Sequence, residues 1–151
     1  MAMSPTMFLI GDGSLIKAFE VGNNEWTCQS TFRGHTRKIT SLTKVNESLF
    51  VSTSYDETAK LWNITKKDPS CLFTFLGHPN FIHSSVFLEE EKAIATGDQD
   101  GNIVVWSIEA CLESDEGKDE IKNRSNHLTI QEDQNISNIQ GGDQNPNTTE
   151  P

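Results

Sequence analysis

Two sets of residues have the types of a nucleophile, a base and a carboxylate. A hydroxyl, an imidazole and a carboxylate in contact can relay a proton away from the hydroxyl oxygen, which is how many hydrolases activate serine. The chain contains such a set twice, first as His35, Ser52 and Asp56 and then as His78, Thr96 and Asp100. Their chemistry could therefore be either nucleophilic catalysis or a hydrogen-bonded structural link.

A tryptophan six residues after each aspartate favours the structural alternative. An indole N–H only donates, so it can donate to the hydroxyl, while the hydroxyl donates to the imidazole and the imidazole to the carboxylate. Each such bond contributes about 0.5–1.5 kcal/mol, and a buried member left unpaired costs more than that. The indole also fills the space that a substrate would need. We therefore predict a structural network and no catalytic residue. Its members are His35, Ser52, Asp56, Trp62, His78, Thr96, Asp100 and Trp106.

Metal and cofactor sites are not expected. The segment from Asp98 to Gly101 resembles part of a calcium loop, but Thr96 and Ser107 stand where the first and last carboxylate ligands belong. The three cysteines and the histidines lack the spacing of a zinc site or a disulfide framework. No glycine-rich phosphate loop is present.

The elements that position these residues are predicted to be short β-strands in a repeat. The Gly34-His35 pair returns after 43 residues, and the aspartate and tryptophan return after 44. Runs rich in β-branched residues, bounded by Gly, Asp and Asn, predict strands at 49–52, 93–96 and 103–108. Several runs are apolar on both faces, which is typical of a strand packed between two layers. A degenerate earlier copy places Phe19 at the tryptophan position.

A repeat of this length, with Gly-His near its start and Trp near its end, resembles the WD40 family of β-propellers. The resemblance covers residues 7–108 and implies an all-β partial propeller of about 2.5 blades. In that family the histidine, hydroxyl, aspartate and tryptophan positions form a buried hydrogen-bonded set, and the resemblance implies the same here. Propellers close with about four to eight blades. We therefore expect a fragment of a longer propeller; the alternatives are a chain whose ring is completed by other chains and a truncated product that does not fold stably.

The resemblance also implies a binding face. In the family, the loops after Gly-His and the turns with the aspartates often hold peptides, and aromatic and arginine side chains dominate such contacts. The expected protein-binding residues are Arg37, Lys38, Tyr55, Asn80, Phe81 and Gln99. This predicts a non-catalytic protein–protein interaction scaffold that binds a peptide or partner protein. The alternatives are an interaction domain of a larger enzyme, such as a ubiquitin ligase or kinase, and a structural subunit of a multiprotein assembly.

Composition divides the chain into blades at 1–112 and an acidic tail at 113–151. The tail has no Phe, Trp, Tyr, Val or Met and is dense in polar residues, so we expect it to be disordered, with 127–130 its one candidate strand. A net charge of −10 without a basic stripe argues against nucleic acid and anionic membranes as partners. With no signal peptide or membrane-length apolar run, we expect a cytoplasmic or nuclear protein.

Overall fold

The computed structural model describes residues 1–66, 71–109 and 128–130, and these form eleven β-strands. This confirms the all-β prediction. The bounds are β1 Met7–Asp12, β2 Leu15–Gly22, β3 Glu25–Phe32, β4 Ile39–Lys44, β5 Leu49–Ser54, β6 Thr58–Asn63, β7 Cys71–Leu76, β8 Ile82–Leu88, β9 Ala93–Asp98, β10 Ile103–Ser107 and β11 Leu128–Ile130.

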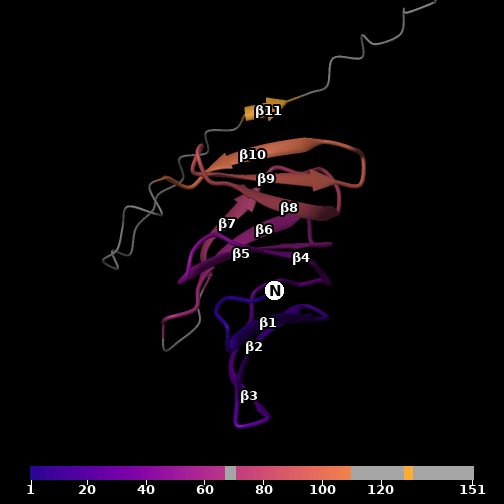
Figure 1. The fold of residues 1–151 in the computed structure, drawn as a ribbon. Coiled ribbons are helices and arrows are strands. Elements are labelled where there is room, and N and C mark those ends of the chain that lie inside the picture. Colours follow the sequence, from indigo (N-terminus) through magenta and orange to yellow (C-terminus); the bar gives the residue numbers. More distant parts are fainter. Residues whose placement is uncertain (67–70, 110–127, 131–151) are drawn as a thin grey trace, which may run out of the picture.

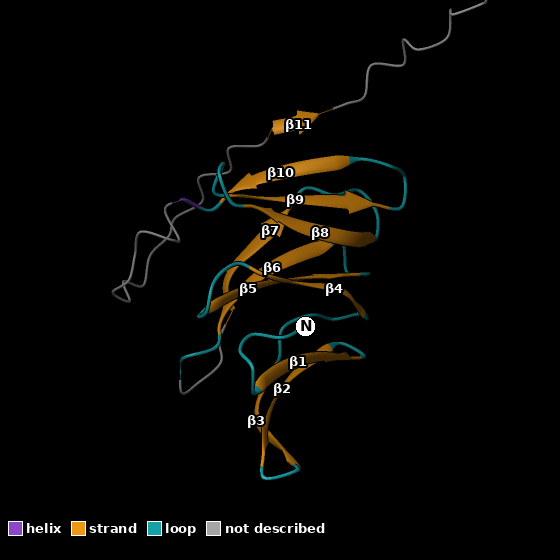
Figure 2. Ribbon diagram, viewed as in Figure 1, coloured by secondary structure: helices purple, strands orange, loops and turns teal. Residues whose placement is uncertain are grey.

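The strands form three antiparallel sheets in which each strand pairs with the next one along the chain. We call them blade 1 (β1–β3), blade 2 (β4–β7) and blade 3 (β8–β11). Figure 1 shows the blades one after another in sequence order, from indigo to orange. Figure 2 shows the same strands joined by turns and loops. This stack of sheets is a partial propeller.

The sequence repeat and the blade are offset by one strand. Each Gly-His pair follows the last strand of a blade: Gly34 comes after β3, and Gly77 comes after β7. The repeat that starts before Gly34 therefore contributes its first strand to blade 1 and its next three strands to blade 2. Every repeat thus spans the junction between two blades and ties them together.

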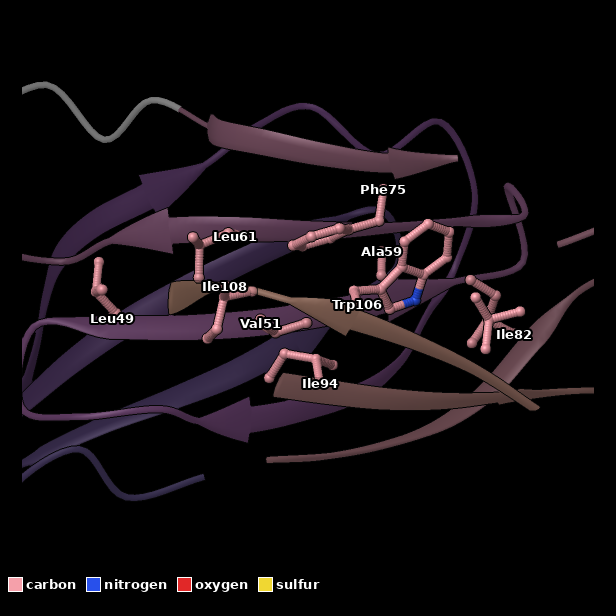
Figure 3. Close-up of a cluster of buried hydrophobic side chains, with 10 residues drawn as sticks. Leu49, Val51, Ala59, Leu61, Phe75, Ile82, Ile94, Trp106 and Ile108 are labelled. Atoms are coloured by element: carbon pink, nitrogen blue, oxygen red, sulfur yellow. The ribbon is translucent and has the colours of Figure 1, made fainter. Parts of the chain in front are cut away.

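Two apolar cores lie between the blades. The core between blades 1 and 2 consists of Met3, Leu9, Ile16, Ala18, Phe32, Ile39, Phe50 and Trp62. The core between blades 2 and 3 consists of Leu49, Val51, Ala59, Leu61, Phe75, Ile82, Ile94, Val104, Trp106 and Ile108. In Figure 3 the side chains of this second core extend toward one another from the two sheets. Blade 2 is covered on both faces, which accounts for its doubly apolar strands.

The predicted acidic tail lies largely outside the described residues, which include only 128–130 of it. Those three residues coincide with the candidate strand and form β11, the fourth strand of blade 3, where they pair with β10. Within the described residues there is no helix long and apolar enough to cross a membrane.

Candidate functional site: two hydrogen-bonded quartets and the loop face beside them

The first quartet comes together between blades 1 and 2. The His35 ring contacts the Asp56 carboxylate through Nδ1 at 2.8 Å and the Ser52 hydroxyl through Nε2 at 2.7 Å. The Trp62 indole donates to the same hydroxyl at 2.8 Å. With Nδ1 protonated, the ring donates to Asp56 and accepts from Ser52, so each of the four groups has a partner.

Burial and hydrogen bonding set the charges in this quartet. Burial lowers the pKa of His35 and outweighs the opposing effect of Asp56, so the ring is neutral at neutral pH. Burial alone would raise the pKa of Asp56. The hydrogen bonds from Thr58, from the Thr36 backbone and from His35 outweigh it and lower that pKa. The first quartet is therefore a neutral ring held against a carboxylate.

The second quartet uses a different aspartate from the one predicted. The His78 ring contacts the Asp98 carboxylate at 3.0 Å and the Thr96 hydroxyl at 2.7 Å, and Trp106 donates to Thr96 at 2.9 Å. Asp100, predicted for this role, is exposed and instead accepts from the Asn80 amide at 3.1 Å. The assignment of Asp100 to the network is therefore wrong.

The difference follows from what stands two residues earlier in each turn. In blade 2 that position is Ser54, whose hydroxyl accepts from the Asp56 backbone N–H. In blade 3 it is Asp98, which accepts from the Asp100 N–H in the same way and has a second oxygen that reaches His78. Asn102 donates to both oxygens of Asp98 and so stabilises this arrangement. Burial would raise the pKa of Asp98, but these bonds outweigh it and lower the pKa.

The glycine of Gly-His is explained by the tryptophan of the same repeat. A Cβ on Gly34 would lie 3.0 Å from the Trp62 ring, closer than side-chain atoms normally approach. The Trp62 ring also packs edge-on against Phe32, with 5.7 Å between the ring centroids. The glycine thus allows the indole to pack under the backbone next to His35.

The quartets are not built for catalysis. The Ser52 hydroxyl and the Thr96 hydroxyl belong to residues that are 0% and 1% exposed. Every buried side-chain polar atom in the described part of the chain has a hydrogen-bond partner. Since substrate cannot reach either hydroxyl, this geometry serves to hold the turn and the Gly-His loop of each blade together. Among the described residues no group of three or more His, Cys, Asp or Glu is placed to hold a metal ion.

Beside the quartets, a column of aromatic and cationic side chains lies between blades 2 and 3. Phe81 packs against Tyr55 with ring centroids 5.1 Å apart, and the Arg37 guanidinium lies over the Phe81 ring at 5.6 Å. His83 also packs edge-on against Tyr55, with 5.4 Å between the ring centroids. We call Arg37, Tyr55, Phe81 and His83 the loop-face cluster. It joins three of the residues predicted to bind a partner.

The other three predicted binding residues surround this cluster less directly. Lys38 is exposed, and its backbone carbonyl accepts from the Tyr55 N–H at 3.0 Å. The Gln99 N–H donates to the Phe81 carbonyl at 2.9 Å, which ties the turn of blade 3 to the loop. Asn80 accepts from the Phe81 N–H at 2.8 Å through its side-chain oxygen.

His83 was not among the predicted residues, and a β-bulge explains its position. The pairing of β8 with β9 shifts between Ile82 and Ser84, so His83 is the extra residue in its strand. The pairing of β4 with β5 shifts at the corresponding place, where Thr40 is the extra residue. The Thr40 hydroxyl donates to the Ile82 carbonyl of the next blade at 2.6 Å. The bulge position therefore contacts the neighbouring blade in both cases.

Comparison with known proteins agrees with this geometry. The family model for the WD domain, G-beta repeat, matches residues 26–63 and again residues 69–107. The chain belongs to the WD40 family. Each match includes the last strand of one blade and three strands of the next, so it follows the offset described above.

Three relatives with WD40-type repeats show how identity and coverage vary among the matches. An uncharacterized WD repeat-containing protein of Schizosaccharomyces pombe is 29% identical over 69% of this chain and 29% of its own length. The Denticleless protein homolog of Danio rerio is 31% identical over 60% of this chain and 14% of its own. Protein lethal(2)denticleless of Drosophila melanogaster is 39% identical over 44% of this chain and 9% of its own. The chain thus matches less than a third of the length of each.

Proposed function

We propose that this chain is a non-catalytic protein-interaction scaffold that binds an extended segment of a partner protein at the loop-face cluster. The observation that carries this is the packing of Tyr55 and Phe81 beneath an exposed arginine. Aromatic and arginine side chains are enriched among the few residues that contribute most of the binding energy at protein interfaces. Two rings from different blades, held by their backbones, form an anchor that is already in place before binding.

The charges around the cluster favour an acidic partner. Arg37 and Lys38 are exposed on the loop of blade 2, and His83 is exposed beside Tyr55. The Asp56 carboxylate beside Tyr55 accepts from His35, the Thr36 N–H and Thr58, and Asp100 accepts from Asn80, so both carboxylates already have donors within the chain. A guanidinium over an aromatic ring keeps several N–H groups directed outward, and it can hold a carboxylate or phosphate with two bonds. The scaffold therefore suits a peptide with an acidic or phosphorylated residue next to an apolar one.

Peptide display tests this function. A random peptide library selected on the full chain should enrich sequences that combine acidic and apolar residues. Enriched peptides should bind the Phe81→Ala variant at least about tenfold more weakly, because an anchor residue contributes about 2 kcal/mol or more. Val86→Ala, which removes an exposed apolar side chain of blade 3, is the matched control and should bind as the parent does. Equal binding by Phe81→Ala, or no enrichment, would contradict the proposal.

We also propose that further WD40-type blades cover the two end faces of this arc, from a longer chain or another subunit. On blade 1 the outer face carries an aromatic group in which Trp26 is 60% exposed and packs against Phe8 and Phe19. On blade 3, Val86 and Ile103 are 52% and 42% exposed. Ala59, which occupies the position of Ile103 in blade 2, is 0% exposed because blade 3 covers it.

Sedimentation tests the end faces. In the absence of further blades, copies of the chain should associate through these faces, so its sedimentation coefficient should rise with concentration. The double variant Trp26→Ser and Ile103→Ser should remain monomeric at the same concentrations. A parent chain that stays monomeric and folded at high concentration would show that these faces do not need a cover.

A further inference from the structure

The fourth strand of blade 3 stands in the same register as the fourth strand of blade 2. In blade 3 the Cα partners are Ile103 with Ile130, Val104 with Thr129, and Val105 with Leu128. In blade 2 the corresponding partners are Ala59 with Phe75, Lys60 with Thr74, and Leu61 with Phe73. Residues 128–130 therefore occupy the positions of residues 73–75, although the chain from Ser107 to Leu128 is much longer than that from Asn63 to Cys71.

The residue types at these positions also agree. Leu128, Thr129 and Ile130 repeat the apolar–threonine–apolar order of Phe73, Thr74 and Phe75. Blade 1 likewise pairs Thr31 with Lys17 of β2, and Phe32 follows it. Threonine thus occupies the equivalent paired position in the last strand of all three blades. Unlike the other two segments, 128–130 is not followed by Gly-His, so it completes a blade without starting another repeat.

As an occupant of this site, β11 is short. β7 has six residues, and its Phe75 is 3% exposed and packs against Trp106 at 5.4 Å between ring centroids. β11 has three residues, and Ile103 in the strand that it pairs with is still 42% exposed. β10, Ile103–Ser107, contains no charged residue. Its edge is therefore an apolar strand-pairing site held by a strand of minimal length.

We propose that the edge of β10 is a strand-addition site, which residues 128–130 occupy within the chain and which an extended partner segment of the order aromatic–Thr–aromatic displaces. Backbone N–H and C=O groups at a sheet edge pair with any incoming strand, and alternate side chains then determine which strand fits best. Phenylalanines at the positions of Phe73 and Phe75 would cover Ile103 and Val105, whereas β11 leaves Ile103 accessible.

The competition between the two occupants has a simple physical basis. Residues 128–130 are tethered, so they compete at an effective concentration set by the length of chain that connects them to β10. A longer connection lowers this concentration, and three paired residues supply few hydrogen bonds. An untethered strand with more paired residues and two aromatic side chains can therefore replace β11. In this arrangement the segment 128–130 acts as a built-in competitor for the site.

A peptide that copies β7 serves as the probe. It comprises residues 71–78 with Cys71→Ser and carries a fluorescent label. We expect it to bind the full chain weakly and to bind the variant Leu128→Pro with Thr129→Pro at least tenfold more tightly, because two successive prolines remove the N–H that faces β10 whichever residue supplies it. Asn135→Pro with Ile136→Pro is the matched control and should bind as the parent does. Equal affinity of all three proteins overturns the proposal.

A reversible cross-link gives a test that does not depend on weakening the strand. Val105→Cys and Leu128→Cys place thiols on Cα partners, in a background where Cys28, Cys71 and Cys111 are serine. Oxidation should form the disulfide and abolish probe binding, and reduction should restore it. The single variant Val105→Cys in the same background should bind the probe equally in both states. Failure of the disulfide to form, or binding unaffected by it, overturns the proposal.

Discussion

The two aspartates of the blade 3 turn provide the sharpest test of the site. Asp98→Asn and Asp100→Asn make the same chemical change two residues apart, and only the structure distinguishes them. Asp98 is buried and its carboxylate contacts His78 at 3.0 Å, whereas Asp100 is exposed and its carboxylate accepts from the Asn80 amide. We expect the first substitution to destabilise the fold and the second to have almost no effect.

The magnitude follows from the acceptors that are lost. The two carboxylate oxygens of Asp98 accept from His78, from the backbone N–H groups of Asp100 and Asn102, and from the Asn102 amide. An asparagine would direct its NH₂ group toward one of these donors, so one charged acceptor is lost and one buried donor is left unpaired. A charge-assisted bond contributes about 1.5–3 kcal/mol, so we expect Asp98→Asn to lower the free energy of unfolding by about 2–4 kcal/mol.

For Asp100→Asn the expected loss is about 0–0.5 kcal/mol, since the site is exposed and the new amide oxygen can still accept from Asn80. Urea denaturation of the full chain, followed by tryptophan fluorescence, measures both values against the parent. Thermal unfolding should show the same order, with about 4–8 °C for each kcal/mol in a domain of this size. A loss for Asp100→Asn equal to or larger than that for Asp98→Asn would refute the assignment of the second quartet.

The remaining predictions concern the first quartet and the contact between blades. Ser52→Ala should lower the free energy of unfolding by about 2–3 kcal/mol in urea titrations, because it leaves two buried ring N–H or N groups without a partner. Gly34→Ala should cost about 1–3 kcal/mol in the same assay, since its methyl group would press on Trp62; no loss would show that the ring can move. The lowered pKa of His35 means that stability is fully present above the ordinary value of 6.5 and declines as pH falls below it. The melting temperature of the parent should fall as the pH is lowered below 6.5, and the fall should be smaller in the His35→Asn variant. Thr40→Val removes the inter-blade bond to Ile82 and should cost about 1 kcal/mol, whereas a null result would show that this bond adds nothing measurable to the apolar core and the Thr43–Ser85 bonds.

The fold could be predicted from the sequence because the repeat carries redundant information. Gly34, His35 and Trp62 each require the others: the glycine admits the indole, and the hydroxyl between the indole and the imidazole links the two rings. When such residues recur together at a fixed spacing, the local geometry recurs with them. The sequence also predicted strands that are covered on both faces. Blade 2 has such strands because both of its neighbouring blades are present in the chain.

Two features of the site could not be predicted from the spacing of the repeat. One depends on side-chain length and the other on strand register. The repeat pattern aligned Asp100 with Asp56, but the pattern does not show that a carboxylate at the Ser54 position is long enough to reach the imidazole. In the same way, periodicity places His83 inside a strand, while the bulge that directs it toward Tyr55 arises from the pairing with β9. Side-chain length and strand register decide these contacts, and neither is encoded in a motif.

The offset between repeat and blade has a practical consequence for anyone who divides this chain. A cut placed between the two family matches, around residues 64–68, separates β7 from the sheet that it completes and leaves β6 as an unpaired edge strand. A cut just before Gly34 or Gly77 keeps whole sheets on both sides. Truncations, fusions and inserted tags should therefore be designed at the glycines, where the covalent chain passes from one sheet to the next.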